Sequence, residues 1–208
     1  MPRSSTVGTH SAGRLSWLQP SEDPADRSRM KGIIFNLLEE IVTEEHGAET
    51  WDDLLDRADL DGAYTSLGSY PDEDLAKIVE AASTALAVPP NDVVRWVGRR
   101  ALPRFHERYP TLFEPYTTTR SFALRLNDII HPEVRKLYPG AGVPEFAFDA
   151  TSSDVLVMEY ASPRRMCAFA EGLLLGTGDH YGEDVQIAQP ECMNRGDARC
   201  LIEVSVAA

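Results

Sequence analysis

The first half of the chain repeats apolar residues at helical spacing. From Met30 onward, apolar side chains recur three or four positions apart until the run stops near His46. Similar patterns surround Trp51, follow an acidic start after Pro71, and follow the proline pair that begins at Pro89. An amphipathic helix buries one such stripe of apolar side chains. The pattern therefore predicts a helical N-terminal half.

Residues 121–138 form a longer apolar helical segment that contains a proline. Pro132 directly follows His131 within this segment. Proline lacks a backbone N–H and disfavours helical conformation in the residue before it. We therefore expect a kink or a break near His131. Upstream, we expect residues 105–113 to continue the apolar side of the preceding helix across a loop.

After Gly140 the pattern becomes that of strands. Four runs rich in β-branched, aromatic or alternating apolar residues predict strands at 146–148, 155–160, 184–187 and 200–206. Residues 164–180 are predicted to form a helix between them. The sequence thus predicts an α+β fold, with a helical N-terminal subdomain packed on a C-terminal antiparallel sheet with helices.

Composition limits the partners of the chain. Its 208 residues, 43% of them apolar, suffice for one domain that encloses a small ligand. The 20 Lys and Arg residues against 33 Asp and Glu residues give a formal net charge of −13. Nucleic acids and anionic membranes both attract basic surfaces, so we expect neither as a partner. No apolar run approaches the roughly 18–20 residues of a membrane-spanning helix.

The N-terminal residues and the cysteines indicate the compartment. Residues 1–29 are rich in Ser, Pro, Asp and Arg and lack the apolar stretch of a secretory signal. We predict a disordered extension over 1–29 and a folded domain over 30–206. Only three cysteines occur, all in the last fifth of the chain. An odd, clustered set argues against a secreted disulfide framework and favours a cytoplasmic protein.

Motifs for catalysis are missing from the sequence. It contains no glycine-rich phosphate loop, no serine nucleophile elbow and no His-Glu-x-x-His pair. Adjacent carboxylates such as Asp52 and Asp53 are interpreted as solvated helix starts. We therefore expect a binding protein rather than an enzyme. An enzyme that acts on a small molecule in an internal cavity is the least favoured alternative.

His131 is the histidine with the most apolar surroundings. Of the five histidines, it alone lies within a long apolar helical segment. One interpretation is an ordinary core or surface histidine. The other is a ligand to a buried metal or haem iron, a frequent role of neutral imidazole. The pattern around His131 leaves both interpretations open.

A triplet of polar residues lies where the second C-terminal strand ends. Tyr160, Ser162 and Arg164 alternate along extended chain, so their donors share one face. Such a set suits a ligand that bears carboxylates, since arginine binds carboxylates through two parallel hydrogen bonds. The alternative is an ordinary strand end with a helix N-cap at Ser162. An axial imidazole together with this triplet would hold haem without covalent attachment.

Several features occur together at characteristic spacing: Met30-Lys-Gly-Ile-Ile, Asn127-Asp-Ile-Ile-His131, Pro139-Gly140, Pro144 and the Tyr160-x-Ser162-x-Arg164 triplet. In this combination the chain resembles the H-NOX family. This is the haem nitric oxide/oxygen-binding domain, also found as the sensor domain of soluble guanylate cyclase. The resemblance runs from Met30 to about Val206. It implies haem b enclosed between the two parts of the fold.

The resemblance also implies roles for individual residues. His131 would be the proximal ligand of the haem iron, and Tyr160, Ser162 and Arg164 would bind the propionates. Pro144 matches a proline that presses on the porphyrin, although an ordinary loop proline is the alternative. Pro132, directly after the ligand, departs from the commoner family sequence and puts the strength of the iron–histidine bond in doubt.

The residues on the distal side, which is the face of the haem opposite His131, decide which gas is bound. Family members that bind O₂ carry a tyrosine donor supported by a tryptophan and an asparagine. The corresponding residues here are Phe169, Leu38 and Ala101, and Phe105 adds to the same apolar wall. The resemblance therefore implies a sensor of NO and CO that excludes stable O₂. It further implies a stand-alone bacterial protein that signals to a histidine kinase or a cyclic-di-GMP enzyme.

The three cysteines, Cys167, Cys192 and Cys200, form a separate candidate site. Three thiolates brought together suit zinc or a redox switch. Some family members hold zinc through three cysteines and a histidine, which would fall near Gln189 here. Inert buried thiols are the third alternative. A haem-independent zinc or thiol redox sensor on the same scaffold is therefore the alternative function.

Overall fold

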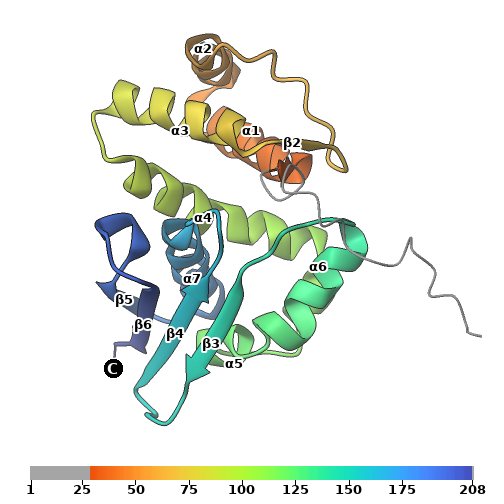
Figure 1. Ribbon diagram of the computed structural model, residues 1–208. Helices are drawn as coiled ribbons and strands as arrows, with labels where there is room; N and C mark the ends of the chain where they lie inside the picture. The colour runs from red at the N-terminus through yellow and green to blue at the C-terminus, as the bar shows by residue number, and fades with distance from the viewer. Residues whose placement is uncertain (1–28, 208) are drawn as a thin grey trace, which may run out of the picture.

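The computed structural model describes residues 29–207. The predicted disordered extension lies outside the described residues, except for Arg29, which belongs to a strand. The N-terminal helices are α1 (Gly32–His46), α2 (Ala48–Ala58), α3 (Asp72–Leu86) and α4 (Pro90–Arg108). Figure 1 shows α1, α2 and α3 together on one side of α4.

The segments directly before α1 and α3 form a two-stranded sheet that the sequence pattern did not indicate. Strand β1 (Arg29–Lys31) pairs antiparallel with β2 (Ser69–Pro71). The Gly32 N–H donates to the Gly68 carbonyl, which ties the start of α1 to the same loop. A pairing between segments about 40 positions apart leaves no local periodicity, so it could not be predicted.

The prediction of a loop that carries residues 105–113 was wrong in its first part. Helix α4 continues through Pro103 to Arg108, and the Tyr109 N–H then donates to the Phe105 carbonyl. A short 3-10 helix follows at Pro110–Leu112. Pro103 removes only one helical hydrogen bond. Packing of the neighbouring buried residues Ala101 and Leu102 keeps the helix continuous.

The segment around His131 changes its helical form. Helix α5 (Thr119–Ala123) is followed by a π-helix, η3 (Leu126–Ile130), and then by α6 (His131–Leu137). The backbone stays helical from η3 into α6, so the helix does not break at His131 but changes there from π to α form. Pro132 lies in the first turn of α6, where its missing N–H costs least.

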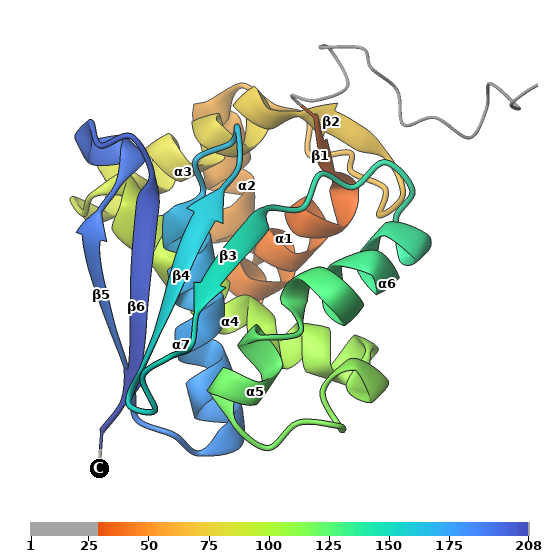
Figure 2. The ribbon, with the colours of Figure 1, turned by 60° about the horizontal axis from the view of Figure 1, so that its bottom comes forward.

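The C-terminal half builds an antiparallel sheet over one long helix. Its strands β3 (Glu145–Asp149), β4 (Val155–Ala161), β5 (Val185–Glu191) and β6 (Cys200–Val206) pair in the order β3-β4-β6-β5. Helix α7 (Cys167–Tyr181) packs behind the sheet, and a 3-10 turn, η4 (Met193–Arg195), joins β5 to β6. Figure 2 shows α7 between the sheet and α4. The predicted α+β fold is confirmed.

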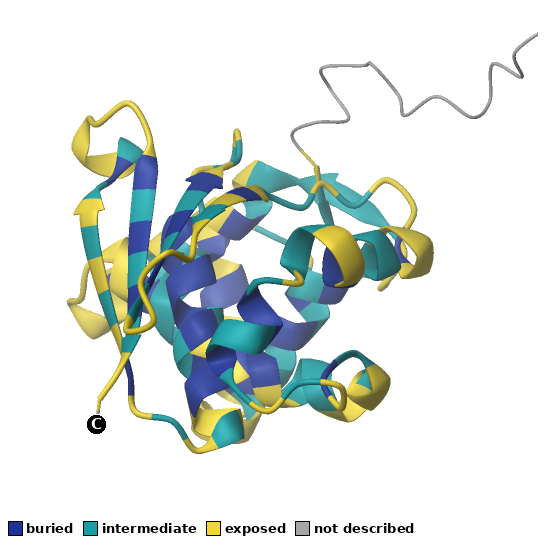
Figure 3. Ribbon diagram, turned by 90° about the horizontal axis from the view of Figure 1, so that it is seen from below, coloured by how far each residue is buried: buried dark blue, intermediate teal, exposed yellow. Residues whose placement is uncertain are grey.

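Two large clusters of buried side chains hold the layers together. One lies among the N-terminal helices and includes Phe35, Ile41 and Ile78. The other lies between α7 and the sheet and includes Met158 and Ile202. Figure 3 shows the buried residues concentrated on the central helices and inner strands. Over the described residues, no helix is long and apolar enough to cross a membrane.

Candidate functional site

A cavity of about 260 Å³ lies between the N-terminal helices and the sheet. Its wall is almost wholly apolar and comes from both halves of the chain. The apolar lining includes Ile33, Ile34, Phe105, Val134, Leu137, Phe146, Met158, Phe169 and Leu173. A site of this kind suits a large apolar ligand whose orientation is fixed by a few polar groups.

His131 lies in the wall of this cavity, at the start of α6. Its side chain is 9% exposed, and Nδ1 has no hydrogen-bond partner among the residues of the described fold. Burial lowers the pKa of His131 to about 4, with a further contribution from the positive charge of Arg135. A hydrogen bond with the backbone of Pro144 raises the pKa and so offsets part of this decrease. A neutral imidazole with an unused ring nitrogen at a cavity is a candidate metal ligand.

The triplet residues Tyr160, Ser162 and Arg164 also line the cavity. The Met166 N–H donates to the Tyr160 hydroxyl at 3.0 Å, and the Arg164 N–H donates to Ser162 Oγ at 3.3 Å. Burial raises the pKa of Tyr160, so the hydroxyl keeps its proton. Helix α7 begins only at Cys167. The alternative of a helix N-cap at Ser162 is therefore wrong.

Arg164 connects the triplet to the N-terminal half. Its Nε donates to the Asp72 carboxylate at 3.0–3.1 Å, and Nη1 donates to the Gly142 carbonyl at 2.7 Å. Asp72 is the first residue of α3. The guanidinium is only 11% exposed, so this ion pair is well shielded from solvent. The contact places a cation at the point where the two halves meet.

Sequence reasoning missed a second feature of the cavity, which is its charge. Three cations line it, Arg29, Lys31 and Arg164, whereas none of the lining residues in the described chain is acidic. This is unexpected in a protein with a net charge of −13. No local signal marks Arg29 or Lys31, since only the pairing of β1 with β2 brings them here. The cavity therefore suits a ligand with negative charges.

The predicted distal residues divide into two pairs. Phe105 and Phe169 line the cavity. Leu38 and Ala101 are 4% and 1% exposed and belong to the cluster among the N-terminal helices, against which Phe105 and Phe169 pack. They are outside the cavity lining in this structure, so their contact with a bound gas stays a prediction. Pro144 lines the cavity beside His131.

The residues present fit haem. An unpartnered imidazole nitrogen could hold the iron, the apolar wall could enclose a porphyrin, and the cations could hold two propionates. The carboxylates needed for the alternative, a cationic ligand, are absent from the cavity lining described above. This set of residues suits a metal-containing cofactor that has a flat apolar ring and negatively charged substituents.

The thiols of Cys167, Cys192 and Cys200 form a separate site behind the sheet. Their sulfur atoms all lie within 4.8 Å of one another, and Cys167 Sγ is 3.6 Å from Cys192 Sγ. The Met193 N–H donates to Cys200 Sγ at 3.3 Å. Burial raises the pKa of Cys167 to about 12. The structure thus brings together three thiols that are 25 and eight positions apart along the chain.

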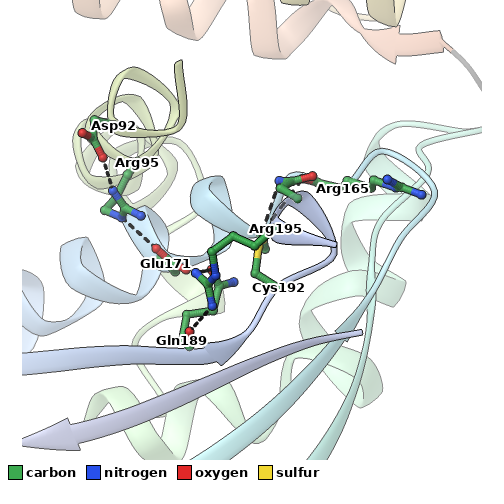
Figure 4. Close-up of polar contacts among 9 residues, drawn as sticks. Asp92, Arg95, Arg165, Glu171, Gln189, Cys192 and Arg195 are labelled. Carbon is green, nitrogen blue, oxygen red and sulfur yellow. Dashed lines mark hydrogen bonds and ion pairs between the residues drawn. The ribbon is translucent and has the colours of Figure 1, made fainter. Parts of the chain in front are cut away.

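The Asn194 amide donates to Cys167 Sγ at 3.6 Å, but the polar side chains near the thiols do not complete a metal site. In Figure 4, Arg95 lies between Asp92 and Glu171, and Arg195 contacts Gln189. Gln189 occupies the region where some relatives would place a histidine, and it supplies an amide. Among the described residues, no histidine or carboxylate joins the three thiols within ligand distance. A fourth zinc ligand from the chain is therefore missing from the described fold.

Comparison with known proteins agrees with this site. A sequence model of the haem-NO-binding family matches residues 31–189, and the chain belongs to this family. The predicted H-NOX resemblance is thereby confirmed. Among solved structures, an H-NOX protein from S. oneidensis in the Fe(II)NO ligation state is 32% identical, with a TM-score of 0.81. The match covers 86% of this chain and all of that chain.

Two further structures extend the comparison. The H-NOX domain from Shewanella oneidensis in the Fe(II)CO ligation state is 32% identical, with a TM-score of 0.77, and the match covers 86% of this chain and 99% of that chain. The Fe(II) unliganded H-NOX protein from K. algicida is 26% identical, with a TM-score of 0.78, and coverage of 86% and 97%. These relatives support a haem-based gas sensor.

Proposed function

We propose that this protein senses NO and CO at a ferrous haem b held by His131, excludes stable O₂, and signals through a separate partner protein. The observation that carries the proposal is the unpartnered Nδ1 of buried His131, in the wall of an apolar cavity that is lined, over residues 29–207, by basic and no acidic side chains. Relatives in Fe(II)NO and Fe(II)CO ligation states support the two gases.

Each residue of the site has one proposed task. His131 holds the iron from the proximal side, and its low pKa keeps the imidazole neutral and able to bind metal at physiological pH. Tyr160, Ser162 and Arg164 donate to the propionates. Pro144 presses on the porphyrin from the loop before β3. The haem supplies a ferrous iron at which a diatomic gas binds.

The distal wall sets the proposed selectivity. Bound O₂ carries partial negative charge and is stabilised by a hydrogen-bond donor, whereas NO and CO need the donor far less. Phe105 and Phe169 present carbon only, and both line the cavity. The wall therefore favours NO and CO over O₂.

Signal transfer follows from the position of His131. It is the first residue of α6, so a change at its imidazole would act directly on α6 and on the π-helix before it. A shift between two arrangements of the halves would then be read by a partner. We propose a histidine kinase or a cyclic-di-GMP enzyme as that partner, in a bacterial cytoplasm, and a role in binding rather than catalysis.

One absorption experiment tests the function. The protein is purified without a His tag, reduced, and scanned before and after NO, CO and air. We expect a strong Soret band that shifts with NO and CO, does not change to an oxy-type spectrum in air, and is lost in His131→Ala. His46→Ala, at an exposed position on α1, should leave the band unchanged. A stable oxy complex, or a Soret band retained by His131→Ala, would contradict the proposal.

The alternative function rests on the three adjacent thiols. A zinc or thiol redox sensor needs only Cys167, Cys192 and Cys200, whose sulfurs already lie within reach of one metal ion. In the same preparation this alternative predicts no Soret band. It predicts zinc by elemental analysis, lost in Cys192→Ser, or a disulfide after oxidation. A Soret band with neither zinc nor a disulfide would leave the haem sensor as the function.

A further inference from the structure

The cations of the cavity have unequal electrostatic surroundings. Arg164 is already matched by the Asp72 carboxylate, so this pair adds no net charge to the cavity. Arg29 is exposed, and its guanidinium donates to the Ser69 carbonyl. The Lys31 ammonium donates to Ser69 Oγ at 2.8 Å, and no carboxylate of residues 29–207 lies within ion-pair distance of it. Lys31 is therefore the half-buried cation whose charge is left unbalanced.

Lys31 and Arg164 both approach the loop that contains Gly140 and Gly142. A Cβ atom built on Gly140 would lie 3.7 Å from Lys31 Nζ, and one built on Gly142 would lie 2.5 Å from Arg164 Nη1. Lys31 comes from β1, and Arg164 comes from the segment between β4 and α7. Both side chains thus lie at the end of the cavity that this loop covers.

Charge balance then assigns a role to Lys31. Haem b carries two carboxylates, and two negative charges in a partly buried site require compensation. We propose that Lys31 binds a haem propionate and supplies the positive charge that the Arg164–Asp72 pair does not. This inference rests on the proposed haem function and adds a binding residue from outside the Tyr160-x-Ser162-x-Arg164 triplet.

The contact would connect the cofactor to the N-terminal helices. Lys31 directly precedes α1, and its strand pairs with β2, which directly precedes α3. The ammonium would exchange its hydroxyl partner on Ser69 for a carboxylate. A bond between an ammonium and a carboxylate, in which both partners are charged, is stronger than the ammonium–hydroxyl bond that it replaces. Movement of a propionate would therefore act on the start of two helices at once.

The rate at which ferric haem leaves the protein for excess apomyoglobin tests the proposal. Loss of a charge-assisted hydrogen bond should speed haem loss from Lys31→Met roughly five- to tenfold relative to wild type. Lys31→Arg, which keeps the charge, should remain within about twofold of wild type. Lys77→Met makes the same change at an exposed position on α3 outside the cavity and should not alter the rate.

Haem dimethyl ester separates a propionate contact from a structural effect. Its two propionates carry no charge, so wild type and Lys31→Met should lose the ester at nearly equal rates. Equal rates with haem b, or an equally large difference with the ester, would overturn the assignment of Lys31. Failure of wild type to take up any haem would overturn the proposed function itself, and the absorption scan reports that result separately.

Discussion

Helix α4 packs against α7 on one side and against α1 on the other. These two helix–helix interfaces, called joints below, are built differently. On the side of α7, glycines bring the two backbones into contact. A Cβ on Gly172 would lie 2.1 Å from the Arg95 carbonyl oxygen, and one on Gly98 would lie 2.5 Å from the Phe169 carbonyl oxygen. On the side of α1, side chains separate the helices. Ion pairs border that joint: Glu40–Arg108, Glu44–Arg104 and Glu45–Arg100.

The difference indicates which part of the molecule can move. Backbones in direct contact cannot slide without collision, because interiors are packed as densely as crystals. A joint made of side chains and partly exposed ion pairs can adjust through small rotamer changes, as packed helices do in shear motions. We therefore expect α4, α7 and the sheet to act as one body. Helices α1, α2 and α3 would shift against it when the site changes.

The largest predicted effect comes from adding a methyl group where the backbones of α4 and α7 are in contact. Gly172→Ala places a methyl group against the Arg95 carbonyl, so α7 must move away from α4. We expect a loss of about 3 kcal/mol in the free energy of unfolding, measured by urea denaturation. This exceeds the ~1 kcal/mol that alanine gains over glycine in helix propensity. Glu80→Ala, at an exposed position of α3, should change stability by less than about 0.5 kcal/mol. Unchanged stability of Gly172→Ala would show that the joint is looser than described.

A second prediction concerns the cavity, which is lined in part by residues of α1 and α4, the two helices of the looser joint. Burial lowers the pKa of His131 to about 4, so in the ligand-free protein the unfolded chain binds a proton more tightly than the folded chain. The contribution of His131 to stability is thus full above pH ~6.5 and falls as the pH drops toward 4. The loss is up to about 3 kcal/mol. Urea denaturation from pH 4 to 7 measures it.

His131→Ala should flatten this slope, because the titrating group is removed. His46→Ala, which removes an exposed histidine, should keep the slope of wild type. A slope that persists in His131→Ala would assign the pH dependence to other groups.

The smallest predicted effect comes from the ion pairs of the looser joint. Replacing Glu40, Glu44 and Glu45 together by glutamine should cost only about 1 kcal/mol, since ion pairs that are partly exposed contribute little. The loss should diminish at high salt. The matched control replaces three exposed acidic residues of α2, Asp52, Asp53 and Asp56, by asparagine. A cost as large as that of Gly172→Ala would mean that the two joints are equally rigid.

Much of the fold could be predicted because its signals are local. Apolar spacing located α1, α2 and α3, and strand-like composition located the four strands of the larger sheet. Pro132 predicted a kink or a break near His131, where the structure instead changes from a π-helix to an α-helix without interruption. The continuation of α4 through Pro103 was missed, because packing of its neighbours outweighs the single lost hydrogen bond.

Only part of the candidate site could be predicted, because only some of its residues are marked by a local signal. The spacing of His131 and the Tyr160-x-Ser162-x-Arg164 triplet is a local signal, and the structure brings these residues to one cavity. The place of Lys31 in that cavity depends on the pairing of β1 with β2. The ion pair of Arg164 with Asp72 joins residues 92 positions apart, which no local pattern records.

The order of residues alone determined where most helices and the strands of the larger sheet form, which imidazole lies in an apolar segment, and which donors line up at a strand end. These properties follow from periodicity and side-chain chemistry over a few neighbouring positions. Tertiary structure decided, within residues 29–207, that the imidazole Nδ1 has no hydrogen-bond partner, that basic and no acidic side chains line the cavity, and that three separated thiols lie within 4.8 Å of one another. Such properties depend on contacts between distant segments, and these exist only once the chain has folded.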